Sequence, residues 1–152
     1  MPVGAQAWSG GDFPPAYRRI LDPFVARGAA ASVTTRIRLG TSVVVVPYHD
    51  PILLAKQCST VYYLSGGRFL LGIGVGYVQK EIENHGVPFK IRYSLMRDKM
   101  RAVLTIWLNE IASYEGQYVK YFKCNRSPNP SSSHDRPSGS ADHYGERSER
   151  HH

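Results

Sequence analysis

The stretch GGRFLLGIGVGYVQKE, residues 66–81, decides the predicted fold of this chain. Its apolar part, residues 68–74, has no polar alternation, which is typical of a strand buried on both faces of a parallel sheet. Three glycines stand at alternate positions at its end, Gly72, Gly74 and Gly76, and a helix-like segment follows. The glycines therefore either cradle a phosphate or end a strand tightly.

A second run of the same kind, IRLGTSVVVV at residues 37–46, precedes this stretch. Between the two runs, Asp50-Pro51 supplies a capping carboxylate and a proline at the first helical position, so we expect a helix to about Leu64. The pair Gly66-Gly67 ends that helix. Strand, helix and strand in this order predict a parallel βαβ unit. The expected inward side of the helix carries Leu54, Cys58 and Val61.

The flanking segments add helices on both sides. Asp22-Pro23 repeats the helix start and predicts a helix to about Thr35. A short helix is expected after Gly76 and a longer one over residues 93–109, so the fold class is α/β. The expected inward stripe of the longer helix is Met96, Met100, Val103, Leu104 and Trp107.

Composition divides the chain into three parts. Residues 1–21 are rich in Gly and Pro and predict an irregular segment, whereas residues 22–122 carry the periodic pattern of a folded domain. Residues 123–152 are rich in Ser, Pro and His and nearly free of aliphatic side chains, so we expect disorder from about Cys124.

Charge and cysteine content narrow the class of protein. The apolar fraction of 42% is near the globular norm, and no run reaches the roughly 18 apolar residues of a membrane span, so we expect a soluble cytoplasmic protein without a membrane partner. The two cysteines have no metal-ligand spacing. The net charge of +7 raises the alternative of a basic nucleic-acid-binding module. The basic residues are scattered rather than clustered, so we expect the protein to have no nucleic-acid partner.

The glycine run departs from the nucleotide-binding motifs. A dinucleotide loop needs G-x-G-x-x-G and a later acidic residue, whereas residues 72–76 read G-x-G-x-G, and no P-loop lysine is present. Glu81 and Glu83 stand two apart on a helix and share no face, so they do not form an acid/base pair. His49 and His85 are expected to be structural or solvent-facing.

Several segments read together resemble the luciferase-like monooxygenase family, in particular its branch that uses the deazaflavin coenzyme F-420. They are RIRLGTSVVVVPYHDPILLAKQ, LSGGRFLLGIGVGYVQKEIENHGVPF, RYSLMRDKMRAVLTIW and YEGQYVKY, in this order within residues 22–122. The resemblance implies a TIM (β/α)8 barrel in which residues 37–46 are the third strand and 68–74 the fourth. It also implies a flavin- or deazaflavin-dependent oxidoreductase, by hydride transfer or monooxygenation of a small-molecule substrate.

The resemblance also places a cofactor. The family has a backbone bulge in its third strand, often with a cis peptide, against the flavin face, and the matching residues are Thr41, Ser42 and Val43. The residues that match the contacts to the ring or ribityl chain are Val75, Gly76 and Tyr77. Coenzyme F-420 is the expected cofactor, with FMN as the alternative, and the glycines would let the backbone approach the ring. Some deazaflavin relatives have a carboxylate at the Tyr77 position, so no proton-transfer role is carried onto that tyrosine.

The chain departs from the family in extent. It shows two convincing strands of the eight that a barrel needs, which indicates a partial barrel. The stretch SPNPSS at residues 127–132 stands where the family has a Pro-Lys-Pro-Val-Gln-like segment, which a two-base shift of reading frame would explain. A catalytically inactive, partly folded remnant is therefore the alternative to an active enzyme. Open sheet edges would allow such a chain to self-associate.

Overall fold

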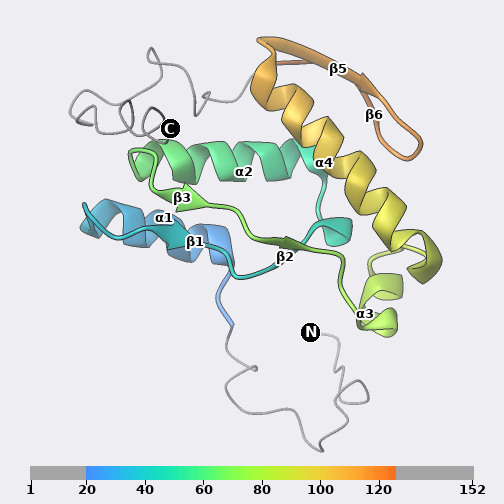
Figure 1. Ribbon diagram of the computed structural model, residues 1–152, viewed down its shortest axis with the longest axis horizontal. Helices are drawn as coiled ribbons and strands as arrows, with labels where there is room; N and C mark the ends of the chain where they lie inside the picture. Colours follow the sequence, from blue (N-terminus) through green and yellow to red (C-terminus); the bar gives the residue numbers. More distant parts are fainter. Residues whose placement is uncertain (1–19, 126–152) are drawn as a thin grey trace, which may run out of the picture.

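The computed structural model describes residues 20–125, which form an α/β fold (Figure 1). Its elements are α1 (Pro23–Val33), β1 (Leu39–Gly40), β2 (Val44–Val45), the 3-10 turn η2 (Val46–Tyr48), α2 (Pro51–Leu64), β3 (Phe69–Leu70), β4 (Ile73–Gly74), α3 (Gln79–Asn84), η3 (Phe89–Ile91), α4 (Arg92–Leu108), β5 (Ile111–Glu115) and β6 (Lys120–Asn125). Within this range no helix is long and apolar enough to cross a membrane. Most of the expected N-terminal segment and tail, including residues 127–132, lies outside the described residues.

The first two long helices begin where the sequence predicts. The carboxylate of Asp22 accepts hydrogen bonds from the amides of Phe24 and Val25, at 2.9 and 2.8 Å. Asp50 caps α2 in the same way, through amides of the first helical turn at 3.0 and 2.9 Å. Gly66 and Gly67 follow the end of α2 with φ angles of 62° and 86°, which glycine adopts without strain. The predicted capping device is confirmed at both helices.

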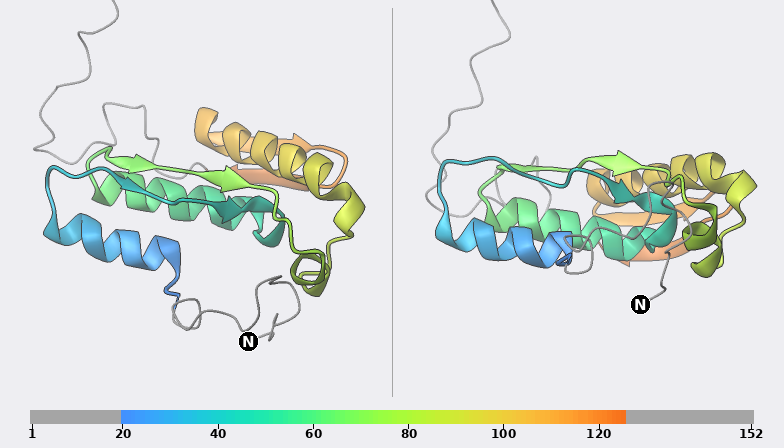
Figure 2. Two further views of the ribbon diagram at one scale, coloured as in Figure 1. Left: turned by 60° about the horizontal axis from the view of Figure 1, so that its bottom comes forward. Right: turned by 90° about the horizontal axis from the view of Figure 1, so that it is seen from below.

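The predicted parallel pairing is also confirmed, although each predicted strand is split in two. Leu39 pairs with Phe69 and Val44 with Ile73, both in parallel register. Helices α1 and α2 lie on the same side of the β1–β3 pair, as the two views of Figure 2 show. The side chains between the helices and strands form the main core, whose larger members include Phe24, Leu39, Val44, Leu54, Val61, Phe69 and Ile106.

The expectation that both faces of the strands are buried is wrong. Val43, Leu70 and Ile73 are 60%, 54% and 41% exposed, on strand positions that alternate with the buried ones. Among the described residues, no second layer covers these side chains, so one face of the strands is packed and the other is open. We call Val43, Leu70 and Ile73 the open face.

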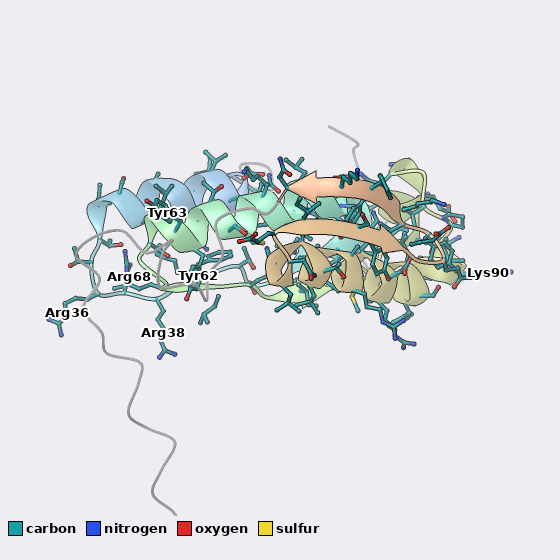
Figure 3. All side chains as sticks on the ribbon, turned by 90° about the horizontal axis from the view of Figure 1, so that it is seen from above. Arg36, Arg38, Tyr62, Tyr63, Arg68 and Lys90 are labelled. Atoms are coloured by element: carbon teal, nitrogen blue, oxygen red, sulfur yellow. The ribbon has the colours of Figure 1, made fainter. Side chains whose placement is uncertain are left out.

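Arg68 fixes the end of α1 beside the sheet. Its guanidinium donates to the carbonyl oxygens of Thr34 at 2.6 Å and Ile37 at 2.7 Å, and its Nε donates to that of Ser65 at 2.7 Å. Figure 3 shows Arg68 near Arg36 at the end of the molecule opposite to Lys90. Because a helix C-terminus presents unpaired carbonyl groups, a cation at this place stabilises the α1–β1 connection.

Helix α4 agrees with the predicted helix to within one residue at each end. One residue of the predicted inward stripe differs. Val103 is buried, whereas Leu104 is 46% exposed, so the prediction for Leu104 is wrong. Met96, Met100 and Trp107 are half-buried and pack against the main core, as predicted. Successive helical residues point about 100° apart, which leaves Leu104 on the solvent side of its buried neighbour Val103. The buried residues of α4 are Leu95, Asp98, Ala102, Val103 and Ile106.

The antiparallel hairpin of β5 and β6 was not predicted. It pairs Ala112 with Cys124 and Glu115 with Lys120. A signal existed in the sequence, because Glu115-Gly116 stands between two segments rich in Tyr, Ile and Val. The expected start of disorder at Cys124 is wrong for residues up to Asn125, since the backbone there is held by pairing with β5.

Candidate functional site

The centre of the candidate site is a one-residue bulge between β1 and β2. Gly40 pairs with Leu70, but Val44 pairs with Ile73, so the three residues 41–43 oppose only two on the neighbouring strand. A bulge of this kind re-aims side chains and interrupts the ladder of hydrogen bonds. The bulge lies where the resemblance places it.

The hydroxyl of Thr41 closes the bulge. Its Oγ1 accepts a hydrogen bond from the amide of Gly72 at 2.9 Å and donates to the carbonyl oxygen of Gly72 at 3.1 Å. The same carbonyl oxygen accepts from the amide of Val44 at 2.8 Å. Thr41 is buried, so its hydroxyl replaces the ladder bonds that the extra residue removes. All peptide bonds of residues 20–125 are trans, so the cis peptide that the resemblance suggests does not occur here.

Two of the alternate glycines, Gly72 and Gly74, make room for the bulge on the neighbouring strand. A Cβ on Gly72 would lie 2.5 Å from the carbonyl oxygen of Ser42 and closer still to that of Thr41. A Cβ on Gly74 would lie 2.6 Å from Cγ1 of Val43. Because the bulge brings two backbone carbonyl oxygens against Gly72, only glycine fits at that position.

The other two bulge residues point away from the core. Ser42 is exposed, and Val43 belongs to the open face. The hydroxyl of Ser42 therefore lies beside the aliphatic side chains of Val43 and Ile73. No described residue covers this strand surface. Such a surface suits a planar ring system, because a ring can lie against aliphatic groups while the hydroxyl and nearby backbone serve its polar edge.

Val75, Gly76 and Tyr77 lead away from the carboxyl end of β4, beside the end of β2 (Figure 1). Gly76 has a φ of 77°, and a Cβ there would approach Cγ1 of Val45 to 2.9 Å. Tyr77 is 82% exposed. The two predicted site segments therefore lie on adjacent parallel strands: residues 41–43 precede β2, and residues 75–77 follow β4 at the carboxyl end of the strands. That end is where barrel enzymes place their active sites.

A cluster beside this edge was not predicted. The ring of Tyr48 stacks on the imidazole of His85, with centroids 4.2 Å apart and planes 10° from parallel. The Tyr48 hydroxyl lies 3.5 Å from Oε2 of Glu81. Burial, reinforced by the Glu81 charge, raises the pKa of Tyr48 to about 12, so the phenol stays protonated and can donate. A signal for this cluster existed in the sequence. The carboxyl ends of adjacent parallel strands lie at the same edge of a sheet, so the segments that follow β2 and β4, which contain η2 and α3, are expected to lie close together.

The cluster lacks the features of a metal centre or a nucleophile. No group of three His, Cys, Asp or Glu side chains able to hold a metal ion occurs within residues 20–125. Cys58 is buried as expected, and burial raises its pKa to about 12, which keeps the thiol protonated and unreactive. The arrangement offers an exposed apolar strand surface and, at Tyr48, a phenol that stays protonated and can donate a hydrogen bond.

Known proteins resemble this chain in sequence and in fold. An uncharacterized protein of Mycobacterium tuberculosis is 42% identical over 118 residues, which cover 78% of this chain and 42% of that protein. An F420-dependent glucose-6-phosphate dehydrogenase of Mycolicibacterium gilvum is 34% identical over 97 residues, which cover 60% of this chain and 29% of the enzyme. The oxygenating constituent of 3,6-diketocamphane monooxygenase from Pseudomonas putida, solved with FMN, has a TM-score of 0.65 at 24% identity and covers 74% of this chain and 32% of its own.

The chain thus spans less than half the length of the relatives it matches. The family model of luciferase-like monooxygenases matches residues 5–137, which is most of the sequence. This chain belongs to the luciferase-like monooxygenase family.

Proposed function

We propose that residues 37–46 and 68–74 are the third and fourth strands of a luciferase-like (β/α)8 barrel and carry part of its cofactor site. The observation that carries the proposal is the bulge at residues 41–43, which Thr41 closes against Gly72. Val43 of the bulge and Ile73 of the neighbouring strand are both exposed. The activity follows from family membership: a flavin- or deazaflavin-dependent oxidoreductase that acts on a small molecule. We also propose that the protein is cytoplasmic.

In this proposal Ser42 and Val43 lie against the cofactor ring, and the backbone of Val75 and Gly76 with the side chain of Tyr77 borders its edge or ribityl chain. The bound cofactor would supply the hydride or oxygen chemistry, while the protein positions it. Coenzyme F-420 is the first candidate, because the F420-dependent dehydrogenase of M. gilvum is among the relatives. FMN is the second, because the similar P. putida structure holds it.

Cofactor titration tests the proposal. We expect saturable quenching of cofactor fluorescence by the full chain, and Ser42→Tyr should weaken the affinity about tenfold or more, because its ring would fill the space at the open face. The matched control is Ser32→Tyr, on the exposed side of α1, which should bind like the parent. Binding that Ser42→Tyr leaves unchanged would contradict the proposed site. No saturable binding of either cofactor would favour the second candidate, an inactive and partly folded remnant.

The open face also leads us to propose that the isolated chain self-associates. Val43, Leu70 and Ile73 are exposed apolar side chains beside strand edges that no described residue pairs. Leu70→Lys should weaken self-association about tenfold, the equivalent of burying one leucine side chain, as measured by sedimentation velocity over a concentration series. Leu64→Lys at the end of α2 is the control, since Leu64 is exposed to a similar extent, 55%, on a helix. Equal effects of the two substitutions would show that association does not use the open face.

A further inference from the structure

Lys99 connects α4 to the turn that follows β2. Its Nζ donates to the carbonyl oxygens of Pro47 at 2.8 Å and His49 at 2.7 Å. Lys99 is half-buried, and burial lowers its pKa while the Asp50 charge opposes that change. A half-buried ammonium group that satisfies two carbonyl oxygens at the end of η2 fixes this turn more firmly than a solvent-exposed lysine could.

The turn that Lys99 holds carries Tyr48, and Tyr48 reaches α3. Tyr48 packs against a second small core, whose buried members are Ile82, Val87 and Leu95. Its ring also stacks on His85, and its hydroxyl approaches Glu81. Helix α3 begins at Gln79, two residues after Tyr77. Contacts therefore lead from Lys99 through Tyr48 to α3, which follows the segment that borders the proposed cofactor.

The Lys99 charge also acts on His49. Burial is the largest effect that lowers the pKa of His49, and the Lys99 and His85 charges lower it further, while the Asp22 carboxylate opposes them. These groups come from α4, the end of α3 and the cap of α1, and the Phe24 ring meets the imidazole edge-on with centroids 6.3 Å apart. The imidazole of His49 is thus a spectroscopic reporter of the Lys99 ammonium group.

We propose that Lys99 is a positioning residue of the cofactor site: it holds the Pro47–His49 turn against α4 and, through Tyr48, sets the place of α3 and of residues 75–77. This inference rests on the proposed function. Lys99 touches neither ring nor substrate in this proposal, and its effect on binding passes through Tyr48.

The test compares three variants of the full chain. Lys99→Met keeps the aliphatic stem and removes the ammonium group, Lys99→Arg keeps a cation that can donate to both carbonyl oxygens, and Lys90→Met is the control. Lys90 is exposed and points away from the ribbon at one end of the molecule (Figure 3). We expect Lys99→Met to weaken binding of coenzyme F-420 or FMN about tenfold, the equivalent of one charge-assisted hydrogen bond. Lys99→Arg should stay within about threefold of the parent, and Lys90→Met should not differ from it.

Two readouts do not depend on the cofactor. Amide hydrogen exchange at Ile82 and His85 should accelerate about tenfold in Lys99→Met only, because α3 loses its support. The pKa of His49, followed by its imidazole NMR signals, should rise in Lys99→Met. If the parent binds no cofactor, the proposed function fails, and the exchange data then decide the Lys99 inference alone.

Unchanged exchange at α3 in Lys99→Met, or an equal loss of binding in Lys99→Arg and Lys99→Met, would overturn the inference. Should Lys99→Met not fold, Tyr48→Leu provides the second test. It removes the stack and the hydroxyl but not the Lys99 contacts, and it should accelerate exchange at Ile82 and His85 by a similar factor. Parent-like exchange in a folded Tyr48→Leu variant would equally overturn it.

Discussion

Replacing Gly72 by alanine is expected to lower the free energy of unfolding by about 3 kcal/mol, the upper range for overpacking a close-packed site. The added methyl group would overlap the carbonyl oxygens of Thr41 and Ser42. Both oxygens belong to backbone, and the Gly72 amide and carbonyl are themselves bonded to Thr41 Oγ1, so neither side can move away without breaking the bulge. Urea unfolding followed by circular dichroism measures the change.

Gly28→Ala is the matched control for this substitution. Gly28 lies inside α1, and a Cβ there would meet nothing within 4 Å. Alanine loses less backbone entropy than glycine in a helix, so this variant should be more stable than the parent by about 0.5–1 kcal/mol. A Gly72→Ala variant as stable as the parent would show that the bulge does not pack against Gly72 as described.

The second large effect concerns Asp98, which joins α4 to the β5–β6 hairpin. Its carboxylate accepts hydrogen bonds from the Tyr114 hydroxyl at 2.7 Å and from the amides of Tyr118 and Val119 at 2.7 and 3.0 Å. A Cβ on Gly116 would overlap the same carboxylate, so the hairpin closes tightly around it. Burial, the largest single effect, raises the pKa of Asp98, but the hydrogen bonds together outweigh it and lower that pKa.

Asp98→Asn should lower the free energy of unfolding at pH 7 by about 3 kcal/mol, because the amide nitrogen of asparagine would face donors that now bind a carboxylate oxygen. The folded-state pKa lies below the unfolded value of roughly 3.9, so the carboxylate contributes its stability above pH 4. That contribution is lost as the pH falls through the folded-state pKa. The difference between parent and Asp98→Asn should therefore shrink in acid, which chemical unfolding at a series of pH values measures.

Glu115→Gln is the control for the Asp98 substitution. Glu115 pairs with Lys120 on the hairpin surface, where both side chains are more than 70% exposed. Exposed ion pairs contribute less than about 1 kcal/mol, so this variant should differ little from the parent at any pH. If Asp98→Asn were as mild as Glu115→Gln, the buried carboxylate would not be the link between α4 and the hairpin.

Some residues of the candidate site could be predicted from the sequence, and others could not. Thr41, Ser42 and Val43 were identified through the family resemblance, and the register places a bulge at these residues. The resemblance could not show that Thr41 uses its hydroxyl within the bulge, since that depends on the distance to Gly72 on another strand. Tyr48 and Glu81, which are 33 residues apart, were not paired because each has an ordinary local context.

The sequence by itself determined the helix starts at Asp22 and Asp50 and the end of α2 at its glycine pair, because each depends on residues close together in the chain. It also determined the parallel order of the strands, because a crossover through one helix returns the chain in the same direction. The tertiary structure alone decided which face of the strands is packed, why Gly72 must be glycine, and how Lys99 and Asp98 anchor distant turns. These features depend on side chains meeting across tens of residues, and local propensity carries no information about the partner.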